Sequence, residues 1–94
     1  MKQRRNILQR IAEQADLPGE PLPGLPVVEL AGDNRVLIER HGGVCEYGQE
    51  RIRVNVRYGQ VCICGFRLRL VHMTGEQLVI AGRIDSVSLI RRRP

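Results

Sequence analysis

Hydrophobic positions divide this chain into two parts with different periodicities. Near the N-terminus apolar residues recur at helical spacing, and from Val27 onward they alternate with polar residues as in half-buried strands. Residues 18–26, between the two parts, contain four prolines and two glycines. We interpret them as a stiff, extended connector.

Residues 1–17 are predicted to form a basic amphipathic helix, with its regular part over residues 2–15. Ile7, Leu8 and Ile11 share one stripe, whereas basic side chains occupy the other faces. About four helical turns are marginally stable alone. We therefore expect these three residues to contact another surface, and an anionic membrane surface stays open as an alternative to protein.

The clearest strand pattern covers residues 51–57, which alternate strictly between aliphatic and polar. The alternation resumes after Tyr58-Gly59, which predicts a hairpin with a two-residue turn at that dipeptide. Such a turn would set Val54 opposite Ile63. The aliphatic side chains of both strands would then lie on the same face.

A second hairpin is predicted around residues 74–76. A two-residue loop would place Ile80 opposite a charged residue, Arg69, whereas a three-residue loop sets Leu70 opposite Ile80. We favour the odd loop with a β-bulge because it keeps the apolar residues on one face.

Glycines that end an apolar segment recur at intervals of 16, 17 and 17 residues, at Gly32, Gly48, Gly65 and Gly82. A second alternating run follows each glycine, which indicates four strand-pair repeats over residues 27–90. Two architectures fit this pattern. We favour a mainly β domain with about eight short strands in a small antiparallel sandwich or partly closed barrel. The alternative is a short β-solenoid with rungs of 16–17 residues.

The composition indicates which residue types fill the core and which cellular compartment the protein occupies. Tyr47, Tyr58 and Phe66 are the whole aromatic set, so the core is expected to be aliphatic. Three cysteines are too few for a disulfide scaffold and favour a reducing compartment. No apolar run is long enough to span a membrane, and no secretory signal is evident. These features predict a cytoplasmic protein.

The net charge of +5 is carried almost entirely by arginine. The predicted sheet places several arginines on the outward face of adjacent strands as a candidate contact face: Arg51, Arg53, Arg57, Arg67 and Arg69. We interpret this face as a surface for a protein partner of unknown identity. The alternatives are a solvated face balanced by Glu39, Glu46 and Glu50, or a small basic nucleic-acid-binding module. Scarce aromatics count against nucleic acid, because single-strand binders stack bases on them. Residues 91–94 form a basic tail.

The cysteines and histidines are the only candidates for metal or thiol chemistry. Cys62 and Cys64 project from one strand face, with Cys45, His41 and His72 elsewhere. Zinc pairs usually sit on tight turns at set spacings, so packing is the favoured role. No metal or cofactor is expected. Because no catalytic motif is present, we expect neither an enzyme nor a small-molecule substrate.

The order of these features resembles the YabP/YqfC family of sporulation proteins. The helix with its Leu-Pro connector and the Ile-Glu-x-His element favour the YqfC branch. The resemblance rests on this series: Asp16-Leu17-Pro18, Leu25-Pro26, Gly32, Ile38-Glu39-Arg40-His41-x-Gly43, Tyr47, Ile52-x-Val54, Gly59-x-Val61-x-Ile63-x-Gly65, Leu68-x-Leu70 and Leu78-x-Ile80-x-Gly82-x-Ile84. Arg40 departs from the pattern, which would place Asn there.

The resemblance implies a non-enzymatic role in endospore formation. Family members are expected in the mother cell, where they act in development of the spore envelope, and the forespore surface is a further expected location. The resemblance supplies no catalytic residues. The final strand is expected to be exposed, which leaves self-association open as well.

Overall fold

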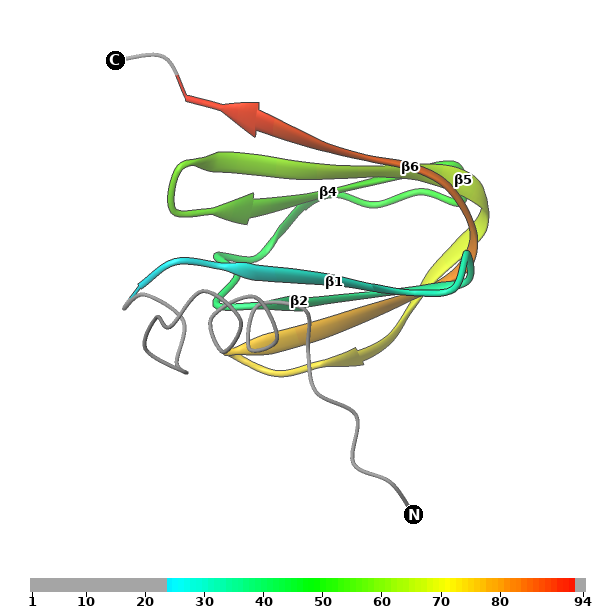
Figure 1. Cartoon of the computed structure of the whole chain (residues 1–94), viewed down its shortest axis with the longest axis horizontal. Coiled ribbons are helices and arrows are strands. Elements are labelled where there is room, and N and C mark those ends of the chain that lie inside the picture. Colours follow the sequence, from blue (N-terminus) through cyan, green and yellow to red (C-terminus); the bar gives the residue numbers. More distant parts are fainter. Residues whose placement is uncertain (1–23, 93–94) are drawn as a thin grey trace, which may run out of the picture.

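Six antiparallel strands form one open sheet in the computed structural model, which describes residues 24–92 (Figure 1). Their order across the sheet is β1-β2-β6-β5-β4-β3. The bounds are β1 Val27–Ala31, β2 Arg35–Glu39, β3 Val44–Glu46, β4 Arg51–Val56, β5 Gly59–Met73 and β6 Gln77–Arg91. The mainly β prediction is confirmed. The predicted helix over residues 2–15 and most of the connector lie outside the described residues.

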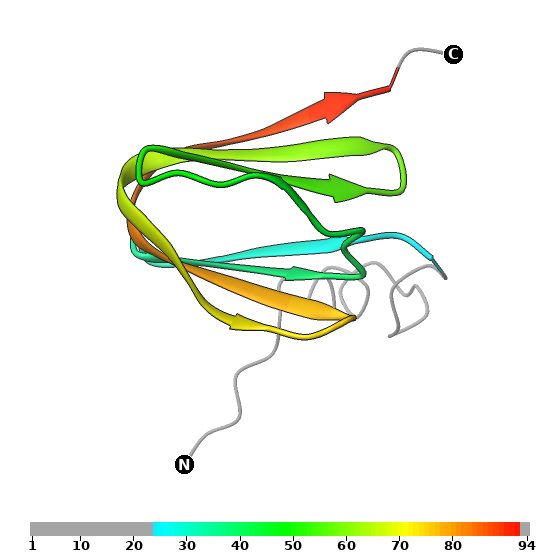
Figure 2. The ribbon, with the colours of Figure 1, turned by 180° about the vertical axis from the view of Figure 1, so that it is seen from behind.

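The sheet is folded over so that its two long strands run through both layers. β5 and β6 have 15 residues each and bend near their middles, as Figures 1 and 2 show from opposite sides. The first and second predicted strand pairs form the β1–β2 and β3–β4 hairpins. The third and fourth are single continuous strands, which is why six strands are found instead of about eight. Every pair is antiparallel, so the described strands are not the parallel rungs of a solenoid.

Two glycines make the bend sterically feasible. A Cβ atom on Gly65 would collide with the carbonyl oxygen of Arg83, and one on Gly82 would lie 2.7 Å from the carbonyl oxygen of Arg67. Gly82 also has φ 137°, a conformation open mainly to glycine. The strands slip register here, beside Gly65 and again between Phe66 and Arg69. The extra residues of such bulges bend the strands.

Backbone hydrogen bonds from the two hairpins hold the bend. The N–H of Gly65 donates to the carbonyl of Glu50 at 3.0 Å, in the β3–β4 loop. In the same way, the N–H of Gly82 donates to the carbonyl of Asn34 at 3.2 Å, in the β1–β2 turn. Each long strand is therefore tied, beside its glycine, to the hairpin that pairs with it.

The core between the layers is aliphatic, as predicted. Corresponding pairs occur on both sides of it: Val36 lies opposite Ile80 in the β2–β6 ladder, and Ile52 lies opposite Ile63 in the β4–β5 ladder. The largest fully buried side chains are Ile38, Ile52, Ile63, Leu68, Leu78, Ile80, Val36, Val54 and Val61. Inward positions on β4 are the aliphatic residues of its alternation, which confirms the predicted face.

The β4–β5 turn differs from the prediction by one residue. It consists of Arg57 and Tyr58, so Val54 pairs with Val61 rather than Ile63. The predicted register is wrong, but the shift is an even number of positions, so the aliphatic face is unchanged. In the second hairpin the predicted pairing of Leu70 with Ile80 and the nearby bulge are confirmed. The predicted three-residue loop is wrong, because Met73 pairs with Leu78 and the N–H of Thr74 donates to the Gln77 carbonyl at 2.7 Å.

The segment after β2 contains a strained residue and a histidine that anchors it. Arg40 has φ 61°, in the left-handed region that Asn tolerates better than most residues. The N–H of Gly43 donates to Nδ1 of His41 at 3.0 Å, so Nε2 donates to the carbonyl of Thr74 at 2.7 Å. His41 thereby ties this segment to the β5–β6 turn.

Substituting Gly82 by alanine tests the bend. The new methyl group would press on the Arg67 carbonyl and force an unfavourable φ, so we expect Gly82→Ala to lower the free energy of unfolding by about 2–4 kcal/mol. The matched control is Gly75→Ala, because a Cβ there has no neighbour within 4 Å; it should change stability by about 0.5 kcal/mol or less. Urea denaturation measures both, and equal losses would contradict the role of the bend.

Arg40→Asn should stabilise the protein. The left-handed conformation costs an ordinary residue about 1–2 kcal/mol and costs Asn less, whereas the substitution gives up one hydrogen bond from Arg40 to the Leu25 carbonyl at 3.3 Å. We expect a net gain of about 0.5 kcal/mol in a thermal or urea melt. Glu39→Asn, in the extended strand β2, is the control and should not stabilise. A loss with Arg40→Asn would show that the hydrogen bond outweighs the strain.

Candidate functional site: an arginine row on the outer face

The outward side of β4 carries the row of polar side chains that its alternation predicts. Ile52, Val54 and Val56 are buried, so Arg51 and Arg53 project from the opposite face of the sheet. β3 lies beside β4 at the edge of the sheet and places Glu46 opposite Arg53. The site therefore brings two cations and one carboxylate together at the edge of the upper layer, which consists of β3, β4, the first half of β5 and the second half of β6.

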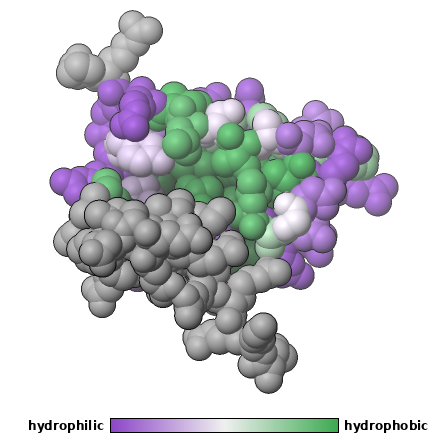
Figure 3. Space-filling view, viewed as in Figure 1, coloured by the Kyte–Doolittle hydropathy of each residue, from purple (hydrophilic) through white to green (hydrophobic). Residues whose placement is uncertain are grey.

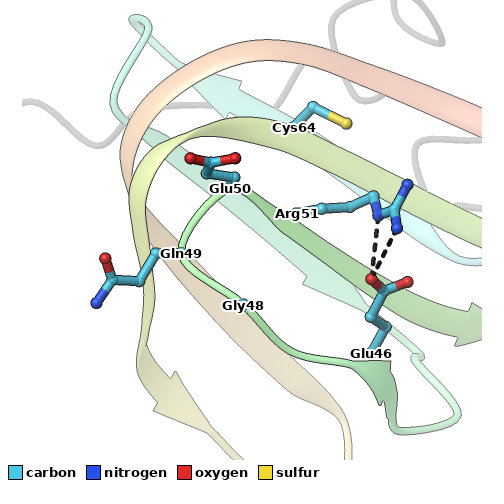
Figure 4. Close-up of a pocket in the computed structure, with 6 residues that line it drawn as sticks. All are labelled: Glu46, Gly48, Gln49, Glu50, Arg51 and Cys64. Carbon is cyan, nitrogen blue, oxygen red and sulfur yellow. Dashed lines mark hydrogen bonds and ion pairs between the residues drawn. The ribbon is translucent and has the colours of Figure 1, made fainter.

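Glu46 joins the two arginines. Its Oε2 accepts from Nε and Nη2 of Arg51 at 3.1 and 3.0 Å, and its Oε1 lies 2.8 Å from Nε of Arg53. Figure 4 shows the contacts between Glu46 and Arg51. The hydrogen bond and the charge of Glu46 raise the pKa of Arg51 above its ordinary value. Two guanidinium groups share one carboxylate, so Arg51 and Arg53, which we call the arginine row, keep a net positive charge and a fixed geometry.

The next strand continues this face with two thiols. Cys62 lies opposite Arg53 and Cys64 lies opposite Arg51, and their sulfur atoms are 3.9 Å apart. Burial is the main cause that raises the pKa of the Cys62 thiol, and the hydrogen bond with Cys64 adds to it. A raised pKa keeps the thiol protonated and unreactive near neutral pH. Within residues 24–92, no three His, Cys, Asp or Glu side chains are close enough to hold a metal ion.

The arginine row borders a wide depression in the surface. Gly48, Gln49 and Glu50 from the β3–β4 loop line it together with Glu46, Arg51 and Cys64 (Figure 4). The depression opens broadly to solvent, unlike the enclosed pockets that bind small molecules. Two carboxylates and one guanidinium group line it. Any capacity to bind an anion therefore lies with the remaining donors of Arg51 and Arg53 at its border, which can form charge-assisted hydrogen bonds.

The structure divides the predicted five-arginine face. β4 pairs with residues 59–64 of β5, so Arg51 and Arg53 lie together, whereas Arg67 lies at the bend and Arg69 lies beyond it. Arg67 has φ 53° and stacks over Phe66, with its Cζ 5.4 Å from the ring centroid. Arg57 belongs to the β4–β5 turn. The predicted helix contacts Ile7, Leu8 and Ile11 lie outside the described residues.

Gln60 is a member of this face that sequence reasoning did not single out. Its side-chain oxygen accepts from Nη1 of Arg53 and its side-chain nitrogen donates to Asn55, both at 3.5 Å. The only signal in the sequence was its position in the alternation, one residue before the buried Val61. The partner across the ladder depends on register, and the predicted register was displaced.

Alkylation by iodoacetamide at pH 8 should separate the cysteines. Thiolate is the nucleophile, and Cys62 is buried with a raised pKa whereas Cys45 is exposed. We expect Cys45 to react at least about tenfold faster than Cys62, measured by mass spectrometry of peptides. In concentrated urea the two rates should converge. Faster reaction of folded Cys62 would contradict the buried, protonated thiol.

Comparison with known proteins agrees with the resemblance seen in the sequence. The model of the YabP family matches residues 26–94. The chain is 25% identical over 91 residues to the uncharacterized protein YqfC of Bacillus subtilis (strain 168), covering 96% of this chain and 98% of the relative. No solved structure matches. Among the described residues, no helix is long and apolar enough to cross a membrane. The match spans the entire β sheet, and the chain therefore belongs to the YabP family.

Proposed function

We propose that this chain is a non-enzymatic sporulation protein that acts in the mother cell during development of the spore envelope, through contact with another protein. Its family is associated with sporulation by name and is not a known enzyme family. The observation that carries the contact mechanism is the pair Arg51 and Arg53, held by Glu46 beside an open depression.

The geometry of this pair suits a protein partner with acidic side chains. Both guanidinium groups are oriented by the same carboxylate before any partner binds, so little side-chain entropy is lost on binding. Arginine is also enriched at protein interfaces. The exposed fractions of the Arg51 and Arg53 side chains are 51% and 36%, which leaves their remaining donors accessible to a carboxylate.

A small nucleic-acid-binding module is the second candidate, and the net charge of +5 is the observation in its favour. The arginine row supports it less well. The residues paired in the β4–β5 ladder include no aromatic ring on which a base could stack. Gel-shift titration distinguishes the two, because binding to nucleic acid must weaken steeply as salt rises.

Removing the charges of the row tests the proposal in a spore-forming host that lacks its own copy. Arg51→Gln combined with Arg53→Gln should weaken binding of the partner by at least about tenfold, which corresponds to about 1.4 kcal/mol of lost contact, and should thereby lower the yield of heat-resistant spores. The same double variant should lose the partner that the unmodified tagged protein retains from sporulating cells.

The matched control is Arg35→Gln combined with Arg69→Gln. Both arginines are exposed and flank Ala81 on the other layer of the sheet, so the control removes equal charge elsewhere and should leave spores unaffected. Normal spores after deletion of the whole protein, with a diffuse signal from a tagged copy at every stage, would overturn the role in sporulation. Equal defects in both double variants would overturn only the contact face.

A further inference from the structure

The second half of β6 has a paired strand on one side only, so this half forms an edge of the sheet. β2 pairs with β6 only as far as Ala81, and the β1–β2 turn bonds it only as far as Ile84. From Asp85 to Arg91 the only described strand beside it is β5. Seven residues in this region therefore present one row of backbone groups to a neighbour outside the described fold.

Hydrogen-bond parity identifies which backbone groups face outward. The N–H of Arg92 donates to the carbonyl of Tyr58 at 2.8 Å, toward β5. Backbone groups alternate in direction along an antiparallel strand, so those of Ile90 and Ser88 also point to β5. The N–H and C=O groups of Val87 and Leu89 point away from it.

Val87 and Leu89, whose backbone groups point away from β5, carry apolar side chains on the inner face of the sheet. Val87 and Leu89 lie opposite Ile63 and Val61, which are both fully buried. Leu89 is nevertheless 57% exposed. The side chains of Val87 and Leu89 face the lower layer across the core, but no described strand lies beside them on the side away from β5.

The second, lower layer of the core, formed by β1, β2, the first half of β6 and the second half of β5, is open on the same side of the molecule, as Leu30 shows. Leu30 lies on the inner face of β1, opposite the buried Val36, yet is 54% exposed. Figure 1 looks onto this side, with the end of β6 above β1, and Figure 3 shows apolar surface between them from the same side. One more strand beside β6 would extend the upper layer over β1.

This edge lacks the features that usually prevent strand pairing. Residues 86–90 contain no charge, proline or glycine. The equivalent half of β5 is protected differently: the N–H of Leu68 donates to the Gln49 carbonyl at 2.8 Å, and that of Leu70 donates to the Tyr47 hydroxyl at 3.4 Å. β3, at the other end of the sheet, has only three residues.

We propose that a second copy of this chain occupies the edge, with the two β6 strands antiparallel and Val87 of each copy opposite Leu89 of the other. The twofold axis then passes beside Ser88. Every outward N–H and C=O of Val87 and Leu89 gains a partner in this register, and the apolar side chains meet on the inner face, over Leu30.

Charge supports both the direction and the register. The edge begins at Asp85 and ends at Arg91 and Arg92. The Asp85 carboxylate accepts from Arg83 at 3.1 and 3.3 Å and is 54% exposed, so antiparallel pairing brings a carboxylate with room for further bonds beside the basic end of the other copy. Parallel pairing would place the basic ends together. Shifting the register by two residues along the strand would put Val87 or Leu89 opposite a charged residue. The interface uses a different surface from the arginine row, so it stands or falls independently of the proposed function.

Sedimentation velocity of the full chain over a range of concentrations tests the dimer. The unmodified protein should shift from monomer to dimer, and Leu89→Lys should raise the dissociation constant by at least about tenfold because the inner-face charge would be buried between copies. Ile90→Lys is the matched control. Ile90 is 42% exposed but lies on the outer face, so the same added charge stays in solvent and leaves the dissociation constant within about threefold.

Amide hydrogen exchange of the unmodified protein tests the register without a variant. The N–H groups of Val87 and Leu89 should exchange quickly in dilute protein and become protected as concentration rises, whereas those of Ser88 and Ile90 are protected throughout. A monomer at all concentrations would overturn the proposal, and protection of Val87 and Leu89 in that monomer would assign the edge to another segment of this chain. A dimer equally weakened by both lysine variants would overturn the register and face proposed.

Discussion

The close approach of β5 and β6 at their bends is the constraint on which the other features depend. Gly65 and Gly82 lie where each strand passes the other's backbone, and a side chain at either position would meet a carbonyl oxygen. Because both strands turn at this point, one sheet supplies both layers of a core. A 94-residue chain forms only a small core, and the fold encloses this core with one continuous hydrogen-bonded sheet.

The bend also determines where charge gathers. β4 follows only the first half of β5, so the arginines of β4 meet Cys62, Cys64 and Gln60 rather than the arginines that follow Gly65. Glu46 then joins Arg51 and Arg53 across the β3–β4 pair. The five arginines of the predicted contact face are thereby divided, and two of them form a small row of fixed geometry.

Uneven pairing along the long strands leaves one edge open. The hairpins cover the first halves of β5 and β6, and the β3–β4 loop bonds the second half of β5 as well. No described residue does this for the end of β6. The protein thus has two surfaces of different character, one charged and preorganised, the other apolar with backbone groups available for pairing.

Alternation along the chain by itself determined the β class, the aliphatic core and the inward face of β4, because side-chain direction follows backbone period. The pairing of Leu70 with Ile80 could be inferred in the same way. The continuity of β5 and β6 could not, since a glycine ending an apolar run marks a turn or a bend equally well. Only the tertiary structure decided between them, through backbone contacts at Gly65 and Gly82 that are remote in sequence. It likewise decided which arginines share a face, because the bend separates the half of β5 that pairs with β4 from the half that carries Arg67 and Arg69.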